Sequence, residues 1–135
     1  MGLIVLDAGV VIAALSPHDA HHRSAVAAIT TAVDRGDRLA IPASALAEAL
    51  VHPYRSSQVA VDQVERFVDE LPATVEPLTR PMARAAAAAR ASFGGRLALP
   101  DALIVATAIV LEADDILTTD LGWPSMGRSV TVVGS

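Results

Sequence analysis

Residues 99–120 read Leu99-Pro-Asp-Ala-Leu-Ile-Val-Ala-Thr-Ala-Ile-Val-Leu-Glu-Ala-Asp-Asp-Ile-Leu-Thr-Thr-Asp120, and they predict a loop, a buried helix and then a strand. Pro100 suits the first turn of a helix, where its missing N–H leaves no hydrogen bond unmade. Asp101 complements the positive end of the helix dipole there. The following residues are almost wholly apolar up to Leu111, so we expect this helix to be covered on most sides. The β-prone residues 116–119 then predict a short strand.

An aspartate follows each of two predicted strands. Asp7 comes directly after the apolar run Leu3–Leu6, and Asp120 comes directly after residues 116–119. The connection rules of α/β proteins favour placing these strands side by side and parallel, which brings both aspartates to the same edge of the sheet. Asp101, at the start of the buried helix, can lie over that edge. Three carboxylates then converge, and a bound metal is the simplest reason to tolerate them.

Helices and strands alternate along the rest of the chain. Apolar spacing predicts helices over 7–15, 25–33, 44–53, 58–71 and 80–93, and strands over 39–41, 74–76 and 130–133. We expect Gly9 to ease the tight turn after Asp7, and Pro53 to end the helix that begins at Ser44. The alternation predicts an α/β fold, a three-layer α/β/α sandwich with a central, mainly parallel sheet, in one domain over residues 1–135.

The composition is more apolar than a small monomer requires. Hydrophobic residues make up 53% of the 135 residues, and the mean hydropathy is +0.47. No apolar run approaches the ~20 residues of a membrane span, so we expect no membrane association. A buried sheet and a homodimer interface, formed by the predicted helices over 58–71 or 80–93, explain the excess. The N-terminal residues lack the positive region of a signal peptide, and the absence of cysteine excludes disulfides; both features are typical of a cytoplasmic protein.

Four acidic residues can reach one crevice. Asp7, Glu48, Asp101 and Asp120 each follow a predicted strand or lie in a helix beside one. Oxygen ligands without histidine or cysteine suit hard cations, so Mg²⁺ is expected and Mn²⁺ is possible. Such a cation lowers the pKa of water and polarises a phosphoryl oxygen, which allows hydrolysis of a phosphodiester. The net charge of −5 disfavours broad binding of nucleic acid, but all ten basic residues are arginines, which contact phosphate well.

The sequence resembles the PIN-domain family, and specifically its small VapC-type toxin ribonucleases. The matching pieces are Ile4-Val-Leu-Asp7, Ser44-Ala-Leu-Ala-Glu48, Leu99-Pro-Asp-Ala-Leu-Ile-Val-Ala-Thr-Ala108 and Leu117-Thr-Thr-Asp120, in family order. The resemblance implies a single PIN domain and a metal-dependent endoribonuclease that leaves 5′-phosphate and 3′-hydroxyl ends. It also implies a homodimer, an RNA substrate and a cognate antitoxin partner. Asp7, Glu48, Asp101 and Asp120 match the family's acidic quartet.

One departure from the family pattern follows the first aspartate. Family members commonly have Ser or Thr there, whereas this chain has Ala8-Gly9. A hydroxyl near Asp7 is therefore missing, and Thr118 or Thr119 is the candidate to replace it. The departure leaves open an alternative function, a catalytically weak or inactive PIN-like module that binds RNA or protein.

Other side chains have more ordinary interpretations. We expect His18, His21 and His22 to lie in a solvated loop rather than in a metal cluster, and Trp123 to anchor a loop. Arg96 is a weaker candidate for gripping substrate phosphate. A phosphorelay receiver domain is excluded, because it needs a late lysine and the chain has no lysine. A haloacid-dehalogenase-type phosphatase is excluded as well, because it needs an aspartate where Gly9 stands.

Overall fold

A computed structural model describes residues 2–134 and contains one five-stranded sheet among its helices. The strands are β1 (Leu3–Leu6), β2 (Arg38–Pro42), β3 (Ala73–Glu76), β4 (Asp115–Thr118) and β5 (Val130–Val132). The helices are α1 (Ala8–Leu15), α2 (His22–Asp34), α3 (Ala43–Ser56), α4 (Gln58–Glu70), α5 (Arg80–Phe93) and α6 (Leu99–Val110), with a 3₁₀ turn over Gly94–Arg96.

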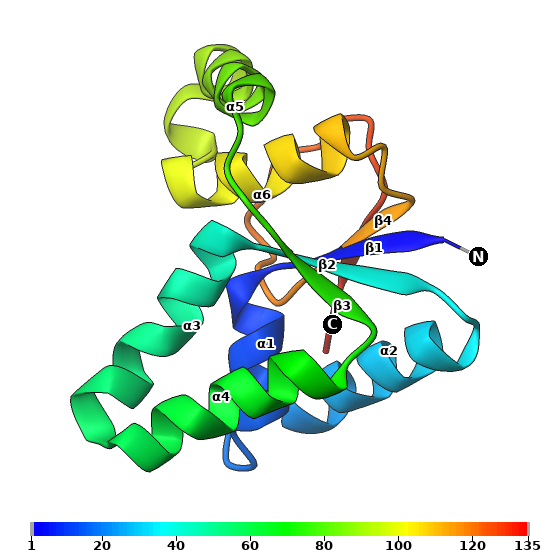
Figure 1. Ribbon diagram of the computed structural model, residues 1–135. Helices are drawn as coiled ribbons and strands as arrows, with labels where there is room; N and C mark the ends of the chain where they lie inside the picture. Colours follow the sequence, from blue (N-terminus) through cyan, green and yellow to red (C-terminus); the bar gives the residue numbers. More distant parts are fainter. Residues whose placement is uncertain (1, 135) are drawn as a thin grey trace.

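The sheet has the strand order β3-β2-β1-β4-β5, and every neighbouring pair is parallel. Helix α6 covers one face, with α5 packed on its outer side, and α1 and α2 cover the other face, while α3 and α4 form a hairpin beside α1 (Figure 1). This is the predicted α/β/α sandwich, and the sheet is wholly parallel in the described residues. No helix in that part of the chain is long and apolar enough to cross a membrane.

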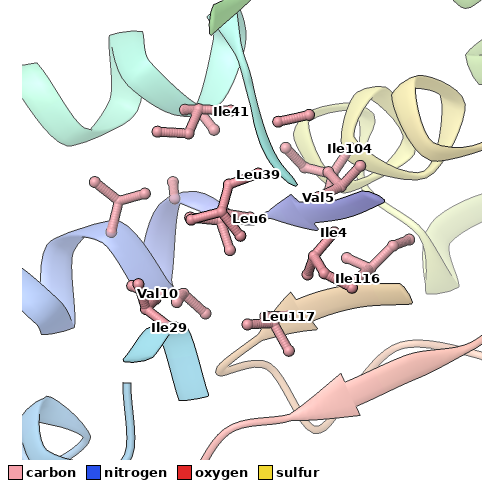
Figure 2. Packing of buried hydrophobic residues seen from close by; sticks show 14 of the residues in the cluster. Ile4, Val5, Leu6, Val10, Ile29, Leu39, Ile41, Ile104, Ile116 and Leu117 are labelled. Carbon is pink, nitrogen blue, oxygen red and sulfur yellow. The ribbon is translucent and has the colours of Figure 1, made fainter. Parts of the chain in front are cut away.

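The core explains why β1 and α6 are so apolar. Parallel strands covered on both faces need apolar side chains on both faces, and Ile4, Val5 and Leu6 are all almost completely buried. Figure 2 shows Val5 beside Ile104 of α6, whereas Leu6 lies on the side of α1. Helix α6 packs between the sheet and α5, so most of its surface is covered and its side chains are apolar.

Two sequence predictions about helix ends have different outcomes. Helix α5 begins at Arg80, after the capping residue Thr79, and ends before Gly94, whose φ is 57°. This confirms the predicted range, because glycine adopts positive φ without strain. The predicted end of α3 at Pro53 is wrong, since the helix continues to Ser56. Proline removes one backbone donor but lies close to the end of this helix, so the last turn still forms and Ser57 N–H donates to Pro53 O.

The topology brings the ends of four elements to one side of the molecule. Strands β1 and β4 are adjacent and parallel, so Asp7 and Asp120 follow neighbouring strands at the same edge. The start of α6 and the first turns of α3 lie on that side too, at the left of Figure 1. Ligands of open α/β sheets bind at this carboxyl edge.

Candidate functional site

Of the four candidate acids, Asp7 accepts the most hydrogen bonds. It is the N-cap of α1, and its Oδ1 accepts a hydrogen bond from Ala8 N–H at 2.7 Å. Its Oδ2 accepts from the Thr118 hydroxyl, also at 2.7 Å. Thr118 Oγ1 in turn accepts from Asp120 N–H at 3.1 Å, and the Thr118 side chain is completely buried. Thr118 therefore ties together the two aspartates that follow β1 and β4.

The pKa of Asp7 is raised above its usual value. Burial is the main cause, and the charge of Asp120 adds to it. The hydrogen bonds from Thr118 and Ala8 act in the opposite direction, because they stabilise the carboxylate. The site thus holds Asp7 in a fixed position at an electrostatic cost.

Asp101 is the most strongly perturbed of the four acids. It lies half-buried in the first turn of α6, where no side chain caps the helix. Burial, followed by the charges of Asp7, Asp120 and Glu48, raises the pKa of Asp101 to about 6. Since this carboxyl feels all three of the others, the four acids share one electrostatic environment. Asp101 therefore lies within electrostatic range of the other three acids.

Glu48 and Asp120 stand at the rim of the site. Both side chains are exposed. Burial and the charge of Asp7 raise the pKa of Glu48, and Asp120 Oδ1 accepts a hydrogen bond from Gly122 N–H at 2.7 Å. Glu48 also lines a mainly apolar cavity of about 140 Å³ between α1, α3 and α4, together with Ile12, His52 and Val64.

The chemistry of the donor set fits a hydrated Mg²⁺ ion. The four acids offer only carboxylate oxygens, which are the ligands of hard cations. Within residues 2–134, no group of three or more histidine or acidic side chains is placed so that it could hold a metal ion. Mg²⁺ usually keeps several waters and takes only one or two carboxylates, so a loose arrangement of mutually repelling acids suits it better than a closed cage.

Gly9 has a different role from the one expected. Its φ is not in the left-handed region, so the turn after Asp7 does not need a glycine. Any Cβ at position 9 would instead collide with the Thr119 hydroxyl. The Thr119 side chain thus lies against the first turn of α1, where the chain lacks the hydroxyl residue of the family pattern. Both candidate threonines reach this region, and Thr118 is the one that hydrogen-bonds Asp7.

The other candidate residues lie as follows. His18 is exposed, but His22 begins α2 and its Nδ1 lies 2.8 Å from Ala13 O, so this ring belongs to helix packing rather than to a solvated loop. Arg96 is exposed, and its guanidinium lies 5.6 Å from the Phe93 ring centroid. Trp123 is half-buried and packs on the core, as expected for a loop anchor. No pattern in the sequence predicts that its indole N–H lies near Asp101.

Comparison with solved structures finds the same fold in bacterial toxin–antitoxin proteins. The VapBC2 structure from Rickettsia felis, bound to a promoter DNA fragment, aligns with a TM-score of 0.72 and 15% identity over 88% of this chain and 89% of the other. FitAcB from Neisseria gonorrhoeae gives 0.71 and 20% over 94% and 95%. Mycobacterium tuberculosis VapC20, described as a Sarcin-Ricin loop cleaving toxin, gives 0.67 and 16% over 84% and 86%.

Sequence comparison gives one further result. No curated protein matches the chain, but the family model described as PIN domain matches residues 4–128. That match spans β1, α6 and β4, and with them all four acids of the carboxyl edge. The chain belongs to the PIN domain family.

Proposed function

We propose that this protein is a Mg²⁺-dependent endoribonuclease and the toxin of a toxin–antitoxin pair, with Mn²⁺ as an alternative cation. The observation that carries the proposal is the shared environment of Asp7, Glu48, Asp101 and Asp120 at the carboxyl edge, where three of the four pKa values are raised. An acidic cluster of this kind is costly unless a cation neutralises it. Membership of the PIN family supports the same activity, and so does the description of the similar VapC20 structure as a cleaving toxin.

The residues of the site have separable tasks in this proposal. Thr118 and the start of α1 hold the Asp7 carboxylate in one orientation. Asp101 lies on α6 and Glu48 on α3, whereas the other two acids follow β1 and β4. The four acids therefore come from four different elements. Bound Mg²⁺ supplies positive charge to the phosphodiester and lowers the pKa of the attacking water. Asp101 must be ionised to take part, because a carboxylate ligand has to lose its proton first.

RNA can approach an acidic protein only where local charge allows it. Cations at the carboxyl edge reduce the formal net charge of −5. Arg96 precedes α6 by three residues, and its exposed guanidinium is the candidate contact to a substrate phosphate near Asp101. Arginine suits this task because its planar group makes two parallel hydrogen bonds to phosphate.

Two protein partners belong to the proposal. The first is a cognate antitoxin, supported by the toxin–antitoxin complexes among the similar structures. The second is another copy of this chain. Of the two helices expected at that interface, α4 exposes the large apolar side chain Val59, whereas α5, described over its whole length, exposes none. Tyr54 of α3 and Ile109 of α6 are exposed as well and add to the apolar surface that a second copy could cover. Sedimentation equilibrium at micromolar concentration tests the homodimer, and a protein that remains monomeric would contradict it.

Cleavage of a mixed RNA pool tests the activity. Purified protein should cut RNA with Mg²⁺ present and stop when a chelator is added, and the products should carry 5′-phosphate and 3′-hydroxyl ends. RNA that is retained but never cut would instead favour the non-catalytic binding module. Products ending in 2′,3′-cyclic phosphate would contradict cation-assisted attack by water, because they arise from attack by the neighbouring hydroxyl.

A further inference from the structure

Trp123 carries a buried hydrogen-bond donor that nothing in the described chain satisfies. The residue lies in the loop between β4 and β5, and its ring packs against the main core. Its Nε1 atom is shielded from solvent and makes no hydrogen bond within residues 2–134. Buried donors are almost always paired in native proteins, because an unpaired one loses its hydration without compensation. The unpaired N–H of Trp123 therefore indicates a hydrogen bond that forms only when a ligand binds.

The acceptor that the Trp123 N–H approaches is the Asp101 carboxyl. The Trp123 indole approaches this group closely enough to lower the pKa of Asp101, against the larger effects of burial and the neighbouring charges. The contact falls short of hydrogen-bond geometry, which is why Nε1 stays unpaired. An indole N–H can only donate and an ionised carboxylate can only accept, so a small rotation of the carboxyl would satisfy both groups.

Asp101 also differs from its neighbours in how it is held. Asp7 accepts from Ala8 and Thr118, and Asp120 accepts from Gly122. Asp101 lacks such an anchor, yet it must keep one oxygen directed toward the other three acids. In metal sites, a hydrogen-bond donor that contacts a cation-binding carboxylate fixes the orientation of that carboxylate.

We propose that the Trp123 indole N–H is the positioning donor of Asp101, closing a hydrogen bond to one carboxylate oxygen when a cation binds and leaving the other oxygen to face the acidic site. This role rests on the proposed function, since it requires a cation at the four acids. Trp123 acts through Asp101 and is not itself a catalytic residue.

Replacement of one atom tests this role. The chain contains a single tryptophan, so biosynthetic incorporation of β-(3-benzothienyl)alanine exchanges only the Trp123 N–H for sulfur while keeping the shape of the ring. Calorimetry with Mn²⁺ alone should show an affinity roughly 10- to 100-fold weaker than that of the unmodified protein. Equal affinities would overturn the proposal.

Stability in chelator separates positioning from packing. The substituted protein should melt no lower than the unmodified protein without cations, because no closed hydrogen bond is lost. A lower melting temperature would show that the N–H is already bonded in the metal-free fold, against the proposal. Trp123→Phe serves as the comparison, because it removes ring volume as well as the N–H and should lower stability in chelator.

The indole resonance gives a direct readout of the bond. A protein labelled with ¹⁵N should show one indole N–H signal, and its proton should move downfield as Mg²⁺ saturates the site. A signal that stays in place while calorimetry shows binding would overturn the role of Trp123 and leave the proposed function intact. Absence of any cation binding to the unmodified protein would overturn both.

Discussion

Replacement of Asp101 by asparagine should stabilise the metal-free protein at alkaline pH. The pKa of Asp101 rises from 3.8 to about 6 on folding, so folding at pH above this value requires an ionised carboxyl in an unfavourable place. An amide carries no such charge. A difference of about 2 between the folded and unfolded pKa values corresponds to roughly 3 kcal/mol. Because the carboxyl is only half-buried and solvent screens it, we expect a gain in unfolding free energy of roughly 1–2 kcal/mol.

The pH dependence of this gain follows from linkage. The folded pKa of Asp101 lies above the unfolded one, so the wild-type protein is stabilised fully below the unfolded value and loses that stability as pH rises through about 6. The advantage of the Asp101→Asn variant should therefore be largest near pH 8 and should disappear near pH 4. For a domain of this size, thermal melts in chelator should show an increase of roughly 3–8 °C near pH 8.

A matched variant controls for the loss of one negative charge. Glu65 is an exposed carboxylate on α4, and Glu65→Gln should change the melting temperature little at any pH. If Asp101→Asn melts at or below the wild-type temperature near pH 8, or if its advantage does not shrink on acidification, Asp101 does not lie in a cluster of repelling acids.

Three further predictions concern the same edge of the sheet. Gly9→Ala should lower the free energy of unfolding by roughly 1–3 kcal/mol, because the added methyl collides with the Thr119 hydroxyl. In chemical denaturation, adding Thr119→Ala should restore most of this loss. Additive effects of the two substitutions would refute the contact. Thr118→Val should destabilise the protein by roughly 1–3 kcal/mol at neutral pH, because it removes the hydrogen bond to the Asp7 carboxylate; Thr118→Ser, which keeps the hydroxyl, should lose less in the same titration. Mg²⁺ should raise the melting temperature at neutral pH. This increase should shrink as pH falls through about 6, because Asp101 then binds a proton that competes with the cation. An increase that is the same at every pH would refute this competition.

The backbone arrangement could be predicted from the sequence because the signals were local. The apolar run of β1 and the long apolar helix α6 require burial on two sides, which only a covered parallel sheet provides. Because β1 and β4 are parallel neighbours, the aspartates that come after them lie at the same edge of the sheet. Pro53 was misleading because a proline near the last turn of a helix costs little, and the sequence does not show where the last turn lies.

The finer contacts of the site could not be predicted in the same way. The hydrogen bond between Thr118 and Asp7 joins residues 111 positions apart, and the choice between Thr118 and Thr119 depends on which side chain the strand turns inward. The need for Gly9 comes from Thr119, which is equally distant in the chain. The unpaired N–H of Trp123 depends on how a loop packs, which periodicity does not encode.

Single-turnover cleavage by matched variants tests whether the four acids at this edge of the sheet cut RNA with a divalent cation. Four variants, each shown to be folded by circular dichroism, should cleave RNA with Mg²⁺ far more slowly than the wild type: Asp7→Asn, Glu48→Gln, Asp101→Asn and Asp120→Asn. The loss should be roughly 100-fold or more for the half-buried acids Asp7 and Asp101. Glu65→Gln, on α4, should cleave at the wild-type rate. Full cleavage by folded Asp7→Asn or Asp101→Asn, or cleavage by the wild type that persists in chelator, would contradict this role of the four acids.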